Sequence, residues 1–125
     1  MKTKYDVFTK DKEKISYRAF IQATLIELGL SPTSKGTYYL RDIITLAIQE
    51  YSYNDVSLVD LRQKLAKKEN TSASTIKTNI DYTFKYKDTS KAEKNFETIF
   101  NTKYDEYYIT AKSLTNLIVS LIYTH

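Results

Sequence analysis

Cysteine and tryptophan are absent from this 125-residue chain, which has only two glycines, one proline and one histidine. Without cysteine the chain forms no disulfide and offers no thiolate to a metal, which fits a reducing compartment. The only histidine, His125, is the last residue, so a histidine-based catalytic triad or metal triplet cannot be assembled. Tight turns depend on glycine and proline, so their scarcity favours helices over a small sheet-rich domain.

Long apolar runs are also missing. The longest, residues 117–123 (LIVSLIY), is far shorter than the roughly 20 residues that cross a bilayer. The N-terminus lacks the apolar stretch of a signal peptide, so we expect a cytoplasmic protein that does not contact a membrane. The net charge of +4 suits nucleic acid, although it also suits a neutral binding module.

Apolar residues recur at helical spacing along most of the chain. This pattern predicts an all-α protein with six helices, at residues 15–28, 35–50, 58–69 and 72–87, from Thr89 or Ser90 onward, and at 110–123. Residues 1–14 are mostly charged and are expected to form a flexible N-terminal arm. Residues 15–125 are then a single helical domain.

Several local signals mark the ends of these helices. Gly29 stands where a left-handed residue ends the first helix, and Asp55 or Ser57 can cap the third. Ser90 and Glu93 have the spacing of a capping box, in which the glutamate reaches back to the cap N–H. The last helix is expected to be buried through five residues: Leu114, Leu117, Ile118, Leu121 and Ile122.

The most informative segment runs from Leu61 to Tyr86 and has the residues of a helix-turn-helix. Ala66 is small enough for a second helix to cross closely, and Asn70 enters the left-handed region at modest cost. Hydroxyls at positions 71, 72 and 74 can accept the free N–H groups of the next helix. Ile76, Ile80 and Phe84 then point inward at intervals of four. The alternative interpretation is an ordinary αα-hairpin within a helical bundle.

In DNA-binding versions of this motif, the second helix lies in the major groove. The outward positions predicted to face bases are Ser72, Ser74, Thr75, Lys77, Thr78 and Asp81. The lysines predicted to contact phosphates are Lys35, Lys64, Lys67, Lys68 and Lys85. Lysine is usually exposed in any case, so a solvated helix surface explains the same pattern.

Signals for catalysis are weak, and we predict neither an enzyme nor a cofactor. Asp105 and Glu106 are adjacent carboxylates in an expected irregular segment, 101–108, where a solvated turn is commoner than an acid–base pair. Residues 35–37 (KGT) end like a phosphate-binding loop, but Ser31 replaces the upstream glycine and no strand precedes them. Tyr38, Tyr39, Tyr51 and Tyr53 fit packing rings with hydroxyls in water better than they fit stacking on bases.

Two blocks of sequence, residues 26–44 (IELGL…KGTYYLRDII) and 65–74 (LAKKENTSAS), go beyond a generic motif. Together they resemble the C-terminal effector domain of the sporulation master response regulator of endospore-forming bacteria. The resemblance runs from about Ile21 towards the C-terminus and weakens after Tyr86. It implies a six-helix domain that regulates transcription through a helix-turn-helix. It also implies binding of double-stranded DNA as a homodimer on tandem sites, and contact with the RNA polymerase sigma subunit or another regulator.

The chain departs from this family at the helix that would read DNA. Where the family carries arginines and a glutamate, this sequence has Thr75, Lys77, Thr78 and Asp81. Because arginine is the commonest reader of guanine, a different DNA site is expected. The family's receiver domain is also missing, so the chain is interpreted as a stand-alone form. The alternative function is a protein-binding inhibitor or antagonist on a repurposed scaffold, from a mobile element or phage.

Overall fold

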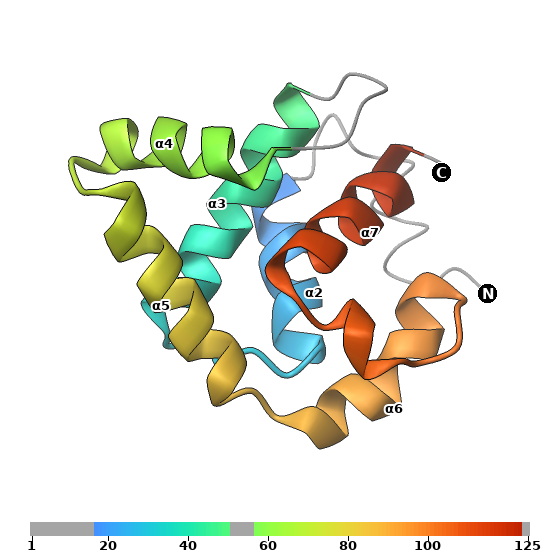
Figure 1. Cartoon of the computed structure of the whole chain (residues 1–125). Coiled ribbons are helices and arrows are strands. Elements are labelled where there is room, and N and C mark those ends of the chain that lie inside the picture. Colours follow the sequence, from blue (N-terminus) through green and yellow to red (C-terminus); the bar gives the residue numbers. More distant parts are fainter. Residues whose placement is uncertain (1–16, 51–56, 124–125) are drawn as a thin grey trace.

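The computed structural model describes residues 17–50 and 57–123. These residues form six α-helices, one short 3₁₀ helix and no strand, so the all-α prediction is confirmed (Figure 1). The elements are α2 (Tyr17–Glu27), α3 (Lys35–Gln49), α4 (Leu58–Glu69), α5 (Ala73–Lys85), α6 (Thr89–Phe100), η1 (Glu106–Tyr108) and α7 (Ala111–Tyr123). The predicted N-terminal arm, 1–14, and Asp55, Tyr51, Tyr53 and His125 lie outside the described residues.

Helix α3 is the centre of the fold and packs against α2, α4, α5 and α7. Its amphipathic sequence explains this position, since Leu40, Ile43, Ile44 and Ile48 are all buried. In Figure 1, α4 and α5 lie on one side of α3, whereas α6 and α7 lie on the other. The two helices of the predicted motif, α4 and α5, therefore pack against the central helix, on the side opposite α6 and α7.

Gly36 allows α5 to lie unusually close to α3. A Cβ at this position would be 2.1 Å from Thr83 Oγ1 and 2.2 Å from the Asn79 carbonyl oxygen. Only glycine leaves room for the α5 backbone at that distance. The KGT sequence that resembles part of a phosphate-binding loop thus serves as a helix-crossing point.

The positions at which the helices begin and end are set by hydrogen bonds of a few residues at their termini. Gly29 has φ +97°, as predicted, and its carbonyl accepts the Asp88 N–H at 2.8 Å, which ties the end of α2 to the start of α6. Ser57 caps α4 and accepts the Asp60 N–H. The predicted Ser90–Glu93 capping box is wrong, because Asp88 is the cap and its carboxylate accepts the N–H groups of Ser90 and Lys91.

The C-terminal helix is less completely buried than predicted. Leu114, Ile118 and Ile122 are buried, but Leu117 and Leu121 are only half-buried because they lie at the edge of the apolar stripe. The segment 101–108 is irregular apart from η1. None of the described helices combines the length and the apolar character that crossing a membrane requires.

Candidate nucleic-acid interface

The turn between α4 and α5 has the conformation that the sequence predicts. Asn70 ends α4 in the left-handed region, with φ 54° and ψ 49°. The Thr71 N–H donates to the Ala66 carbonyl at 3.0 Å, and Ala66 itself is buried at 6% exposure. A left-handed residue followed by this backward hydrogen bond ends a helix abruptly and reverses the chain within residues 70–72.

Ser72 begins α5 as its N-cap. The Ser72 Oγ accepts the Thr75 N–H at 3.0 Å and donates to Thr75 Oγ1 at 2.8 Å. The Thr75 carbonyl in turn accepts the Asn79 side-chain amide at 2.9 Å. The Ser72 and Thr75 hydroxyls are therefore engaged in capping, although both side chains are exposed.

The two faces of α5 differ sharply. Ile76, Ile80 and Thr83 are buried against the rest of the domain, and Thr83 also hydrogen-bonds to Ser34 at the start of α3. Phe84, predicted to point inward, is half-buried. The opposite face holds the residues that were predicted to contact bases, and each of them is exposed: Ser72, Ser74, Thr75, Lys77, Thr78 and Asp81.

The two charged residues on this outer face contact each other. Lys77 Nζ lies 2.7 Å from Asp81 Oδ2, one helical turn away, and both side chains are about three-fifths exposed. A solvent-exposed i,i+4 pair adds only about 0.3–0.5 kcal/mol to stability. The ion pair therefore matters more for the chemistry of the α5 surface than for stability. It places a hydrogen-bond donor beside an acceptor, with their charges compensated.

Four of the five predicted phosphate-contacting lysines fall into two groups at the ends of α5. Lys64 and Lys67 line a shallow hollow that they share with Ala73 at the start of α5. Lys35 and Tyr86 line another hollow near its end, and Lys85 Nζ lies 5.5 Å from the centre of the Tyr86 ring. Lys64 is partly neutralised, because its Nζ lies 2.7 Å from Glu50 Oε2.

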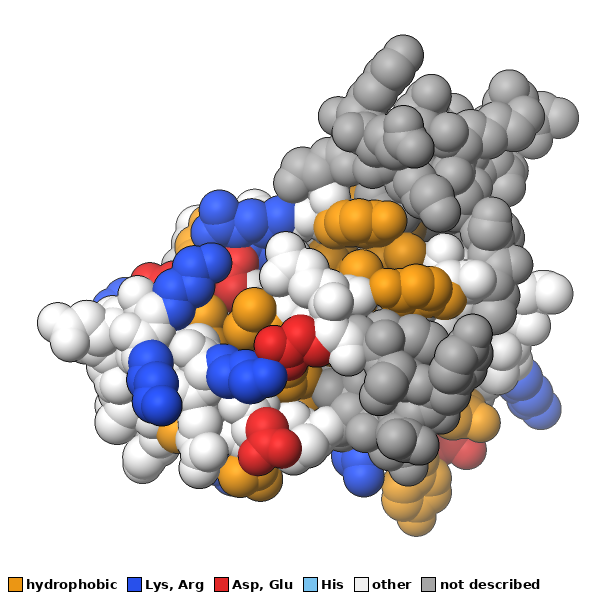
Figure 2. Space-filling model, turned by 90° about the horizontal axis from the view of Figure 1, so that it is seen from above, with side chains coloured by type: hydrophobic (Ala, Val, Ile, Leu, Met, Phe, Trp, Pro, Cys, Tyr) orange, Lys and Arg blue, Asp and Glu red, His pale blue; other side chains and the backbone are white. Residues whose placement is uncertain are grey.

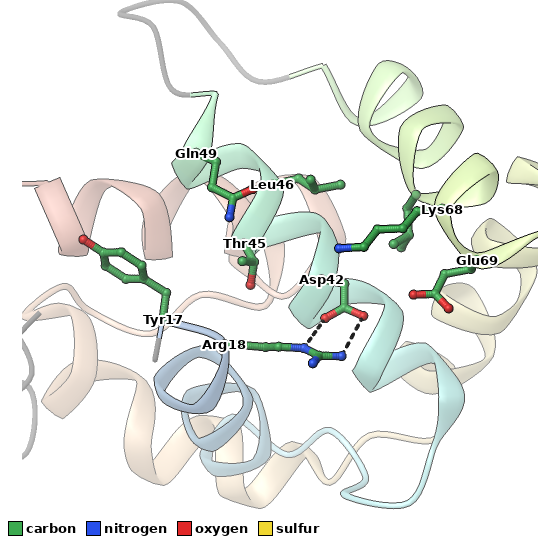
Figure 3. Close-up of a pocket in the computed structure, with 9 residues that line it drawn as sticks. Tyr17, Arg18, Asp42, Thr45, Leu46, Gln49, Lys68 and Glu69 are labelled. Carbon is green, nitrogen blue, oxygen red and sulfur yellow. Dashed lines mark hydrogen bonds and ion pairs between the residues drawn. The ribbon is translucent and has the colours of Figure 1, made fainter. Parts of the chain in front are cut away.

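Lys68 is not brought together with the other lysines. It lines a cleft between α2, α3 and α4, and Figure 3 shows it extending from α4 towards the side of α3 where Asp42 lies. Asp42 already accepts hydrogen bonds from Arg18 at 2.9 Å and Arg41 at 3.0 Å. The hydrogen bond to Asp42 and its negative charge raise the pKa of Arg18, so this arginine stays protonated. Asp42 is therefore paired with arginines and is not free to pair with Lys68 alone.

The surface on the α4 side carries both signs of charge. Figure 2 looks down on this side and shows Lys and Arg side chains with Asp and Glu side chains among them. A continuous positive stripe would favour DNA as the partner, whereas a mixed face also suits a protein. The α4 surface is of the mixed kind.

Three further residues of this region, Asn79, Tyr82 and Tyr86, were not among the site residues predicted from the sequence. All three line the hollow at the far end of α5, and the rings of Tyr82 and Tyr86 are 4.7 Å apart. Both tyrosines are more than 60% exposed. Because the two tyrosines are four residues apart, the sequence could have predicted that their rings lie on one face of the helix.

The adjacent carboxylates Asp105 and Glu106 have structural partners. Asp105 accepts the Tyr107 N–H and caps η1. Glu106 accepts a hydrogen bond from the Tyr104 hydroxyl and pairs with Lys87 at 3.2 Å, and these two contacts lower the pKa of Glu106. The hydrogen bond to Glu106 raises the pKa of Tyr104 to about 12. Across the described residues, no group of three or more acidic side chains is placed to hold a metal ion.

Comparison with known proteins does not extend these observations. No protein-family model matches the chain, and a search of curated proteins found no match.

Proposed function

We propose that this protein is a sequence-specific DNA-binding transcriptional regulator that inserts α5 into the major groove. The observation that carries the proposal is the pairing of a tight, left-handed turn at Asn70 with a second helix whose whole outer face is exposed. An α-helix fits the major groove of B-DNA, and the second helix of such a motif reads bases there. The resemblance of residues 26–44 and 65–74 to a sporulation regulator's effector domain supports the same function.

The positions of three lysines suit a complex in which α5 lies in the major groove. Lys67 lies near the start of α5 and Lys85 and Lys35 lie near its end, so basic groups flank the outer face on both sides. Phosphate contacts fix the position of a helix on DNA, whereas contacts from the helix face select the sequence. Binding on tandem sites as a homodimer and contact with a sigma subunit follow from the resemblance and belong to the same proposal.

The test is selection from a randomised duplex pool at two salt concentrations, followed by affinity measurements on the enriched site. If Lys35, Lys67 and Lys85 each neutralise one phosphate, the logarithm of the binding constant falls with the logarithm of salt with a slope of about −3 per protomer. Lys67→Ala should make that slope shallower by about one unit. Lys94→Ala is the matched control, because Lys94 is an exposed lysine on α6, away from α4 and α5.

A second candidate is a protein-binding antagonist that uses the same face. The Lys77–Asp81 ion pair and the exposed Tyr82 and Tyr86 favour it, because paired charges and amphipathic rings are common at protein interfaces. Failure of the pool to enrich any sequence, with retention on DNA unaffected by salt, would refute the DNA proposal and favour this candidate.

A further inference from the structure

The Lys77–Asp81 ion pair has the donor–acceptor spacing of the major-groove edge of one base pair, with the opposite polarity. The pair joins a donor, Lys77 Nζ, to an acceptor, Asp81 Oδ2, at 2.7 Å. In a G·C pair, the guanine O6 acceptor and the cytosine N4 donor are themselves hydrogen-bonded at about 2.9 Å and both point into the major groove. The two edges therefore match in spacing and are opposite in polarity.

We propose that Lys77 and Asp81 act as one unit that reads a single G·C base pair in one orientation. This inference rests on the proposed function and adds its specificity. Lys77 donates to the guanine acceptors while Asp81 accepts from the cytosine amino group, and the ion pair stays closed. Because Lys77 and Asp81 remain paired on binding, neither charge is buried alone at the interface, and the desolvation cost of an unpaired charge is avoided.

The other base pairs fit this unit less well. An A·T pair, with adenine in the place of guanine, presents only the thymine O4 acceptor to Asp81. A T·A pair offers the adenine N6 donor to Asp81, but the adjacent N7 acceptor then faces the same carboxylate. Lys77 is left with the single O4 acceptor of thymine, beside its methyl group. A C·G pair exchanges donor and acceptor, so the ammonium meets an amino group and the carboxylate meets two acceptors. Each replacement should lower affinity about ten-fold, the discrimination that a well-placed pair of base contacts provides.

The neighbouring side chains allow a base pair to approach the unit. Ser74 and Thr78 lie on the same exposed face, and both have short side chains beside the longer Lys77 and Asp81. The ion pair is about three-fifths exposed at each end. Two of the three ammonium donors and the second carboxylate oxygen therefore remain available to base edges.

The decisive experiment exchanges the two charges. The double variant Lys77→Asp, Asp81→Lys keeps the ion pair on α5 and places the acid N-terminal to the base, the more favourable order in a helix. Both residues are exposed, so the variant should fold, which circular dichroism and thermal melting verify. Wild type and variant are each used to select from the same randomised duplex pool.

We expect the enriched motifs to differ at one position, where G·C for the wild type becomes C·G for the variant, with the other positions unchanged. Lys85→Ala is the control, because loss of a phosphate contact should weaken binding about equally for all sequences and leave the motif intact. Identical motifs from wild type and swapped variant would overturn the inference and leave the proposed function standing. Enrichment of no motif by either protein would overturn both.

Discussion

Replacing Gly36 by alanine tests whether the close crossing of α3 and α5 fixes the position of α5. The new Cβ would meet Thr83 Oγ1 at 2.1 Å and the Asn79 carbonyl oxygen at 2.2 Å, where ordinary contact begins at 3.4 Å. Thr83 can change its side-chain position, but the Asn79 carbonyl belongs to the α5 backbone. Relief of the clash therefore requires α5 to move by about 1 Å in a close-packed interior.

The magnitude follows from two opposing terms. Overpacking of this kind costs about 1–3 kcal/mol, whereas alanine gains up to about 1 kcal/mol over glycine in a helix. The net expectation is a destabilisation of about 1–2 kcal/mol, which raises the unfolded fraction roughly 5- to 30-fold. Urea unfolding followed by circular dichroism measures it as a lower midpoint with an unchanged slope.

The control separates helix propensity from steric conflict. Thr98→Ala places alanine at an exposed position of α6 and should leave stability unchanged or slightly raised. If Gly36→Ala were as stable as wild type or more so, the crossing would not be as close as described. In that case, contact with Gly36 would not fix the position of α5 on α3.

Three further outcomes follow from the helix ends. Asn70→Gly should change stability by only a few tenths of a kcal/mol, whereas Asn70→Ala should cost about 1–2 kcal/mol in urea unfolding, since alanine at φ 54° carries the left-handed penalty. Ser72→Ala should cost about 1 kcal/mol by removing the α5 cap, and Ser72→Asp should retain stability. The hydrogen bonds that Asp88 accepts, chiefly from the Ser90 hydroxyl, lower the pKa of Asp88. Its contribution to folding stability is therefore present above its ordinary pKa near 4 and is lost as pH falls through the lowered value. The stability difference between wild type and Asp88→Asn, measured by unfolding from pH 7 to pH 2.5, should therefore shrink on acidification; a constant difference would contradict this assignment.

The fold was predictable because the chain repeats one simple signal. Apolar residues at helical spacing located the six helices, and Asn70 and Gly29 marked the ends of α4 and α2 through their backbone preferences. Competition between neighbouring caps was harder to predict. Asp88 and Ser90 both suit a helix start, and in the structure Asp88 is the cap, with its own N–H bonded to the Gly29 carbonyl of another segment.

The exposure of the residues in the candidate interface was predictable, but the contacts among their side chains were not. Periodicity identifies which residues of α5 face outward, and all six predicted positions are exposed. It does not reveal that Lys64 is paired with Glu50 or that Lys68 lines a cleft beside Asp42, because those contacts join different helices. Long-range side-chain pairing depends on the angles at which the helices cross, which the spacing of one helix cannot supply.

The Lys77–Asp81 pair changes what the absence of recognition-helix arginines would mean for the proposed DNA binding by this chain. An isolated acid at position 81 would repel phosphate and weaken every DNA complex, so it would count against a DNA-binding function. Because that carboxylate lies 2.7 Å from Lys77 Nζ, its charge is compensated locally, and in the proposed complex its remaining effect would be on the choice of base. Affinity would then depend on lysines that flank α5, and specificity on a neutral pair at its centre. A regulator built in this way would bind non-specific DNA weakly without giving up discrimination at its own site.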